Sequence, residues 1–134
     1  MIVAVWRVSS ANFDVEDFLR RFPTLAPDAV WRRGEPRLVR GKHEDSGFNL
    51  TLEEAENGAA AVSQARDALA RLRPALLELR RLSVPSLVDF GLFVGGPVSF
   101  TGSVRFAPDV LQWFSEQGVG LSVSAYPVSE EDEV

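Results

Sequence analysis

A stripe of apolar residues between Ala59 and Leu82 constrains the fold of this chain more than any other feature. Its members recur at alternating steps of three and four residues, which places them on one side of an α-helix, while charged and amide side chains occupy the opposite side. Burying its four leucines contributes about 6–12 kcal/mol, comparable to the net stability of a domain. The stripe therefore predicts a helix packed on a broad apolar partner. Its members are Val62, Ala65, Leu69, Leu72, Leu76 and Leu79.

Pro74 lies inside this stripe and leaves two alternatives for the helix. A proline in a helix interior lacks an N–H and clashes with the preceding turn, at a cost of about 3 kcal/mol or more. At the first position of a helix the missing N–H costs nothing. Because the apolar register continues across Pro74, we expect either one kinked helix or two helices, the second with Pro74 at its first position.

The composition is that of one ordinary globular domain. With 134 residues, 46% of them apolar and 25% charged, the chain can bury a core. We expect one domain over residues 1–127 and an acidic, mobile tail at 128–134. The lack of cysteine excludes disulfides, thiolate zinc sites and thiol redox chemistry. The apolar run before Arg7 is too short for a signal peptide or a membrane span, so we expect a cytoplasmic protein with no membrane partner.

The distribution of charge argues against nucleic-acid binding. The net charge is −5, with +3 over residues 1–42 and −8 over the remainder. A nucleic-acid-binding surface usually carries a continuous basic stripe. Here the basic residues are interleaved with acidic ones and form no such stripe. We therefore expect no nucleic-acid partner.

The rest of the chain alternates between strand and helix patterns. Alternating or continuous apolar runs predict strands at 2–9, 37–40, 46–52, 87–94, 98–106 and 121–125. Helical spacing predicts helices after a cap at Asn12 or Asp14 and again from Pro108 to Gly118, and residues 23–36 read as a loop. Gly95-Gly96 indicates a hairpin. This order predicts an α+β two-layer sandwich, with a mainly antiparallel sheet of about six strands, three helical segments on one face, and a free polar face.

His43, the only histidine, is the strongest candidate for chemistry. It stands beside Glu44 and Asp45 in a polar turn. A general base needs an orienting partner and a sheltered position, and a metal site here would rest on one imidazole and carboxylates, so a solvated turn is the simpler interpretation. We expect no catalytic residue, no metal site and no cofactor, and an enzyme using His43 is the least favoured alternative.

Trp31, Arg32 and Arg33 form the most distinctive group in the predicted loop. A tryptophan beside arginines is typical of interface hot spots. In the structural alternative, Trp31 folds onto the core and the arginines hold carboxylates or backbone carbonyls. The candidate partner-binding residues are Trp31, Arg32, Arg33 and His43.

Several segments resemble the bacterial family catalogued as domain of unknown function 4279. They are FDVEDFLRRF, AVWRRGEP, SGFNLTL, LARLRPALLEL and FAPDVLQWFSEQGVGLSVSAYP. They cover nearly the whole chain and contain no catalytic signature, although the family often has tryptophan where Phe48 stands here. The resemblance implies a bacterial domain from a family without an established activity, with an immunity-type, toxin-neutralising role as one form of partner binding.

A non-enzymatic protein-binding module is the function that these observations favour. Its partner would be a toxin or a second copy of the chain. The alternative is a structural homodimer joined through the polar face of the sheet, so that the protein is a monomer or a homodimer. The residues that would form that flat surface are Ser99, Thr101, Ser103, Ser122 and Ser124.

Overall fold

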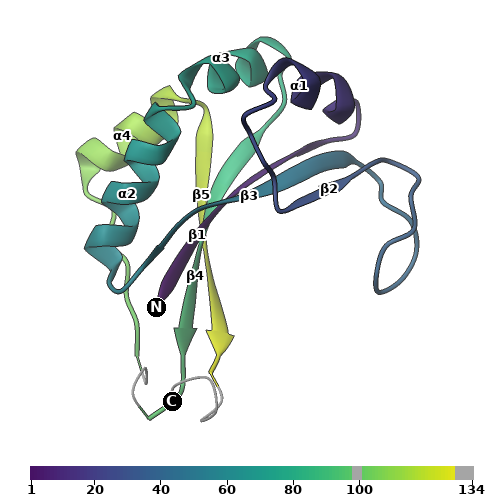
Figure 1. Cartoon of the computed structure of the whole chain (residues 1–134). Helices are drawn as coiled ribbons and strands as arrows, with labels where there is room; N and C mark the ends of the chain where they lie inside the picture. Colours follow the sequence, from purple (N-terminus) through teal and green to yellow (C-terminus); the bar gives the residue numbers. More distant parts are fainter. Residues whose placement is uncertain (98–100, 129–134) are drawn as a thin grey trace.

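The computed structural model describes residues 1–97 and 101–128. Within these ranges the chain has one open, mixed sheet of five strands together with four helices (Figure 1). The α+β class is confirmed, whereas the two-layer sandwich stays a prediction. The strands are β1 (Ile2–Ser10), β2 (Ala29–Trp31), β3 (Ser46–Ala55), β4 (Ser86–Val94) and β5 (Val119–Pro127), and the helices are α1 (Val15–Arg21), α2 (Gly58–Ala70), α3 (Arg73–Arg81) and α4 (Pro108–Glu116).

The sheet has the strand order β2-β3-β1-β4-β5, so the first strand of the chain lies at its centre. β1 pairs antiparallel with β3 and with β4, and β2 pairs antiparallel with β3. β5 lies parallel to β4, from Ser86 opposite Val119 to Val94 opposite Pro127. A parallel pair needs a long crossover, which α4 and the segment before it supply. The sheet is therefore mainly antiparallel, as expected, with one parallel edge pair.

One face of the sheet forms the core. Side chains alternate between the two faces along a strand, and in β1 every second residue from Ile2 to Val8 is buried. α2 packs on β1 and β3, and α4 packs on β5. Figure 1 shows both helices on the same side of the sheet. The largest wholly buried side chains include Trp6, Phe18, Phe48, Phe90, Phe114 and Leu69.

The apolar stripe forms two helices and not one kinked helix. α2 ends at Ala70, and α3 begins at Arg73 with Pro74 as its second residue, where the missing N–H costs nothing. The side chain of Asn57 caps α2 by accepting a hydrogen bond from the N–H of Ala60 at 2.9 Å. The predicted packing of the stripe is confirmed: Val62, Ala65, Leu69, Leu76 and Leu79 are buried, and Leu72, between the helices, is half-buried.

One predicted strand is wrong, the described part of a second is not a strand, and one strand was not expected. Residues 37–40 form no strand: residues 38–40 are bends, with only an isolated bridge between Pro36 and Lys42. Of the predicted strand at 98–106, residues 98–100 lie outside the described residues, and the rest forms no strand. In the described part, Val104 and Phe106 nevertheless pack against the core, and the rings of Phe106 and Phe90 have their centroids 5.3 Å apart. Residues 101–107 lead into α4 and do not join the sheet, so among the described residues β4 is not followed by the expected hairpin strand. The unexpected strand is β2.

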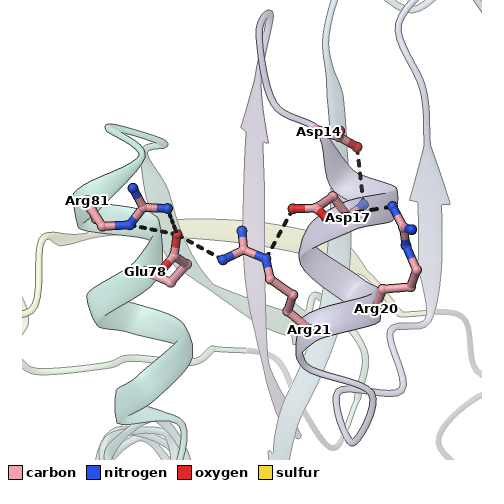
Figure 2. Close-up of polar contacts among 6 residues, drawn as sticks. All are labelled: Asp14, Asp17, Arg20, Arg21, Glu78 and Arg81. Atoms are coloured by element: carbon pink, nitrogen blue, oxygen red, sulfur yellow. Dashed lines mark hydrogen bonds and ion pairs between the residues drawn. The ribbon is translucent and has the colours of Figure 1, made fainter.

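Ion pairs join α1 to α3 (Figure 2). Asp14 caps α1 by accepting from the N–H of Asp17 at 3.1 Å, which confirms one of the two predicted caps. Arg21 places Nε 3.1 Å from Asp17 Oδ2 and Nη1 3.1 Å from Glu78 Oε1. Glu78 also accepts from Arg81 Nε at 2.9 Å. Hydrogen bonds from Arg81, and less strongly from Arg21, hold the pKa of Glu78 below its ordinary value, although burial opposes them.

Val128, at the predicted start of the acidic tail, is bonded to the sheet. Its N–H donates to the carbonyl oxygen of Val94 at 3.0 Å. The remaining residues of the predicted tail, 129–134, lie outside the described residues.

Candidate functional site

Trp31 lies at the end of β2, on the face of the sheet that the helices leave uncovered. In the pairing of β2 with β3, Val30 stands opposite Phe48 and Trp31 opposite Gly47. Val30 packs against the core, and because neighbouring residues of a strand point to opposite faces, Trp31 points to the uncovered face. A Cβ at Gly47 would lie 2.2 Å from the oxygen of Val8 and 2.8 Å from Cζ2 of Trp31. Trp31 is therefore a strand residue and not the predicted loop residue.

Two contacts fix the indole ring of Trp31. Its Nε1 donates a hydrogen bond to Asp45 Oδ1 at 2.8 Å. Its ring stacks on that of His43, with centroids 5.8 Å apart and planes inclined by 23°. The side chain is half-buried, so part of the ring faces solvent. The structure thus brings together two of the four candidate residues and adds Asp45, which was not among them.

Residues 32–45 fold back on themselves as one long loop. The N–H of Gly34 donates to the oxygen of His43, and the N–H of His43 donates to the oxygen of Glu35, both at 2.8 Å. Nearer the tip, the N–H of Arg37 donates to the oxygen of Gly41 at 2.9 Å, and Gly41 adopts the positive φ of 75° that glycine allows. These bonds leave the tip in solvent. The tip consists of Leu38, Val39 and Arg40, all exposed.

Two open hollows flank the stack of Trp31 on His43. Their volumes are about 470 and 450 Å³, within the range that accepts a small ligand or several side chains of a partner. Both are lined by Ala29, Trp31, Arg37 and His43. The first extends to Asn49 in β3, and the second extends to Leu38 and Val39 at the tip of the loop.

Arg32 and Arg33 do not act together. The guanidinium of Arg32 is bonded to Glu16 of α1 and lies 3.4 Å from Glu35, and these hydrogen bonds raise its pKa. Arg33 donates its backbone N–H to Ser46 Oγ at 2.9 Å, and its side chain is exposed. The structural alternative therefore holds for Arg32, which pairs with carboxylates, whereas Arg33 presents its charge to solvent.

The loop offers aromatic, apolar and charged groups in one place: basic residues at its tip, and Glu35, Glu44 and Asp45 in the lining of the hollows. His43 stacks through its ring, and its hydrogen bonds within the described ranges are made by its backbone. Among the described residues, no group of three or more histidines, aspartates or glutamates is placed to hold a metal ion. Leu38, Val39 and Arg37 were not candidates, because the sequence pattern assigned them to a strand. The sequence signal that could have identified this site is the apolar pair Leu38-Val39 between the basic residues Arg37 and Arg40.

A polar network crosses the uncovered face beside the first hollow. Asp89 of β4 is buried, and its Oδ1 accepts hydrogen bonds from Ser122 Oγ at 2.6 Å and Ser124 Oγ at 2.8 Å. Arg7 Nη2 lies 3.7 Å from Asp89 Oδ2. With the amide of Asn49 turned to suit its neighbours, the amide oxygen accepts from Arg7 Nη1 at 3.0 Å. The network links β3, β1, β4 and β5. Of the five residues expected at a dimer surface, Ser122 and Ser124 therefore bind within their own chain, Thr101 and Ser103 lie outside the sheet, and Ser99 lies outside the described residues.

A search for membrane-crossing segments within residues 1–97 and 101–128 finds no helix with the necessary length and apolar character.

A scan against protein-family models, a search of curated proteins and a search of solved structures each find no match. The resemblance to domain of unknown function 4279 therefore stays a prediction from the sequence, and the geometry of the loop carries the functional argument.

Proposed function

We propose that this protein is a non-enzymatic protein-binding module that docks its partner on the loop around Trp31. The observation that carries the proposal is the fixed orientation of the indole, which Asp45 and His43 hold in place while it borders two open hollows. An aromatic side chain ordered before binding loses little conformational entropy when a partner arrives. We call this region the Trp31 surface, made of Trp31, Arg33, Arg37, Leu38, Val39, Arg40, Lys42 and His43.

The chemistry of the Trp31 surface indicates the kind of partner. Leu38 and Val39 stand in solvent, although such side chains gain free energy when they are removed from water. Residues 36–42 include three basic residues and no acidic one, in a chain whose net charge is −5. The complementary partner is a protein segment that presents an apolar side chain next to carboxylates.

The surroundings of His43 support binding more than catalysis. A general base works best in a sheltered position with an orienting hydrogen bond, whereas His43 lines open hollows and stacks on Trp31. Toxin neutralisation is a more specific form of the same proposal. Its support is the sequence resemblance alone, and it requires a partner with toxic activity.

The double variant Leu38→Ser, Val39→Ser tests the proposal without disturbing the core, because both side chains are exposed. Wild-type and variant proteins are used as baits in native cell extract, and captured proteins are quantified by mass spectrometry. Leu77→Ser is the matched control, since Leu77 is an exposed leucine on α3. A partner should be retained by the wild type and by Leu77→Ser and lost by the double variant.

The purified partner then permits a measurement of affinity by calorimetry. Trp31→Ala is expected to raise the dissociation constant at least about 30-fold, as loss of a central aromatic anchor does. Trp31→Phe keeps a ring but loses the bond to Asp45, and an intermediate value is expected. Binding should also weaken as salt is added. The proposal fails if every captured protein binds the double variant as well as the wild type.

A further inference from the structure

The outer edge of β5 presents unpaired backbone groups. Within the described ranges β5 pairs with β4 alone. The bond from the N–H of Val128 to the oxygen of Val94 shows that even-numbered residues direct their backbone groups to β4. Because alternate residues of a strand direct these groups to opposite sides, Leu121, Val123 and Ala125 direct theirs outward. Pro127, which lacks an N–H, also falls on the outer side, where proline is tolerated.

Apart from Pro127 at its end, this edge carries, among the described residues, none of the devices that usually prevent pairing between chains. Proteins place charges on exposed edges or cover them, yet residues 119–127 contain no charged side chain. Val123 is 52% exposed and Tyr126 is 40% exposed. The opposite edge of the sheet is different, because Asp28 covers it by accepting from the N–H of Thr51 at 2.6 Å. The sheet therefore has one edge that is open and one that is partly closed.

The side of α4 that faces this edge is uncharged as well. Trp113 is turned toward α2, where Arg66 lies 5.2 Å from the centre of its ring. Leu111 is two residues from Trp113, about 200° around the helix, so it lies on the side away from α2. It is 47% exposed. Pro108 and Ser115 share that side by their helical spacing. An uncharged strip thus runs along β5 and the adjoining side of α4, with Leu111 and Val123 among its exposed apolar side chains.

We propose that a second copy of this chain pairs with β5 along its open edge, antiparallel and with the two-fold axis at Val123. This arrangement forms about eight main-chain hydrogen bonds and continues the sheet into the second copy. It places Leu121 opposite Ala125 of the second copy, and Tyr126 opposite Gly120, so that large residues meet small ones. Val123 meets its own equivalent.

Self-association fits this edge better than capture of another peptide. No like charges meet across the proposed axis, because the strand has none. The axis is perpendicular to the sheet, so α4 of each copy lies on the same side of the joined sheet, and the exposed Leu111 side chains flank the new contact. Because both copies use the same edge in a two-fold contact, the contact closes as a dimer and does not extend into a fibre. The proposal is independent of the Trp31 surface, which lies at the opposite edge.

Analytical ultracentrifugation from about 1 μM to about 1 mM tests the proposal with the full chain. The wild type should pass from monomer to dimer in this range. Val123→Asp places two carboxylates face to face and is expected to raise the dissociation constant about 100-fold or more. Leu77→Asp is the control, since Leu77 is 51% exposed on α3, and its dissociation constant should equal that of the wild type. Circular dichroism confirms that each variant is folded.

Residue-resolved amide exchange separates this edge from other modes of association. In the dimer, the N–H groups of Leu121, Val123 and Ala125 should exchange at least about tenfold more slowly than in the Val123→Asp monomer. The neighbouring even-numbered amides, already bonded to β4, should change less. A wild type that stays monomeric at the highest concentration overturns the proposal. A dimer that survives Val123→Asp, or one that leaves these three amides unprotected, overturns it equally.

Discussion

Gly47 has no side chain, and this lets the indole of Trp31 lie close to β3. We expect Gly47→Ala to lower the free energy of unfolding by about 1–3 kcal/mol. The added methyl group would lie 2.2 Å from the backbone oxygen of Val8, which cannot move without disturbing β1, and 2.8 Å from Trp31. Urea unfolding followed by circular dichroism measures the loss, and tryptophan fluorescence reports any displacement of the indole.

Gly120 provides the matched control for this substitution. A Cβ at Gly120 would lie 3.6 Å from its nearest neighbour, Cβ of Leu87, which is an ordinary contact. We therefore expect Gly120→Ala to change the free energy of unfolding by no more than about 0.5 kcal/mol. Equal losses at the two glycines would show that the space around Trp31 is not the cause.

At the scale of elements, two adjacent leucines of α3 show which face of the apolar stripe is buried. Leu76 is 2% exposed and Leu77 is 51% exposed. Leu76→Ala is expected to lower the free energy of unfolding by about 2–5 kcal/mol, because it leaves a cavity between α3 and the core. Leu77→Ala should change it by less than about 0.5 kcal/mol. Similar losses in thermal or urea unfolding would refute the assignment of the buried face.

The ion pairs between α1 and α3 make part of the stability depend on pH. The pKa of Glu78 is lower in the folded protein than its ordinary value because Arg81 and Arg21 donate hydrogen bonds to it. A carboxyl with a lowered folded-state pKa stabilises the fold above its unfolded pKa of about 4.3, and this contribution is lost as pH falls through the folded pKa.

Urea unfolding of Glu78→Gln at several pH values measures that contribution. The stability difference between wild type and variant should be largest near pH 7 and should shrink below about pH 4. Glu54→Gln is the control, because Glu54 is exposed and belongs to no ion pair among the described residues. A stability difference that grows as the pH falls would contradict the expected role of the Glu78 carboxylate.

The elements predicted correctly from the sequence are those in which regularly spaced apolar residues determine the buried face. The stripe that became α2 and α3, and the strands at β3 and β4, follow from which side chains must leave water. The same signal failed at residues 101–106, because alternation reports which side chains face the core and not whether the backbone is paired. Phe106 meets Phe90 from a crossover above the sheet. β2 has only three residues, so its pairing depends on β3 and not on a pattern of its own.

Only part of the candidate site was predicted, because the rest depends on contacts that leave no pattern in the sequence. Residue types alone pointed to Trp31 and His43, which the structure stacks together. The bond from Trp31 to Asp45 and the exposed tip depend on the path of the loop. The backbone hydrogen bonds of His43 with Gly34 and Glu35 define that path. Such long-range backbone contacts leave no periodic signal in a single sequence.

At the scale of the whole molecule, Asp89 ties the last strand to the rest of the sheet. Asp89→Ala removes the acceptor for Ser122 and Ser124 and the anion beside Arg7. We expect it to lower the free energy of unfolding by about 2–4 kcal/mol. Amide exchange should accelerate more in β5 than in β3, and Asp89→Asn, which keeps one acceptor oxygen, should do less harm. Equal acceleration in every strand would contradict this local role.

The central position of β1 also determines when the sheet can assemble. β1 is synthesised before the other strands, yet its two neighbours, β3 and β4, begin at Ser46 and Ser86. At about 5–20 residues per second, a ribosome needs several seconds to reach the second of them. During that interval the apolar residues of β1 emerge without their final partners, so folding on the ribosome must wait for the second half of the chain.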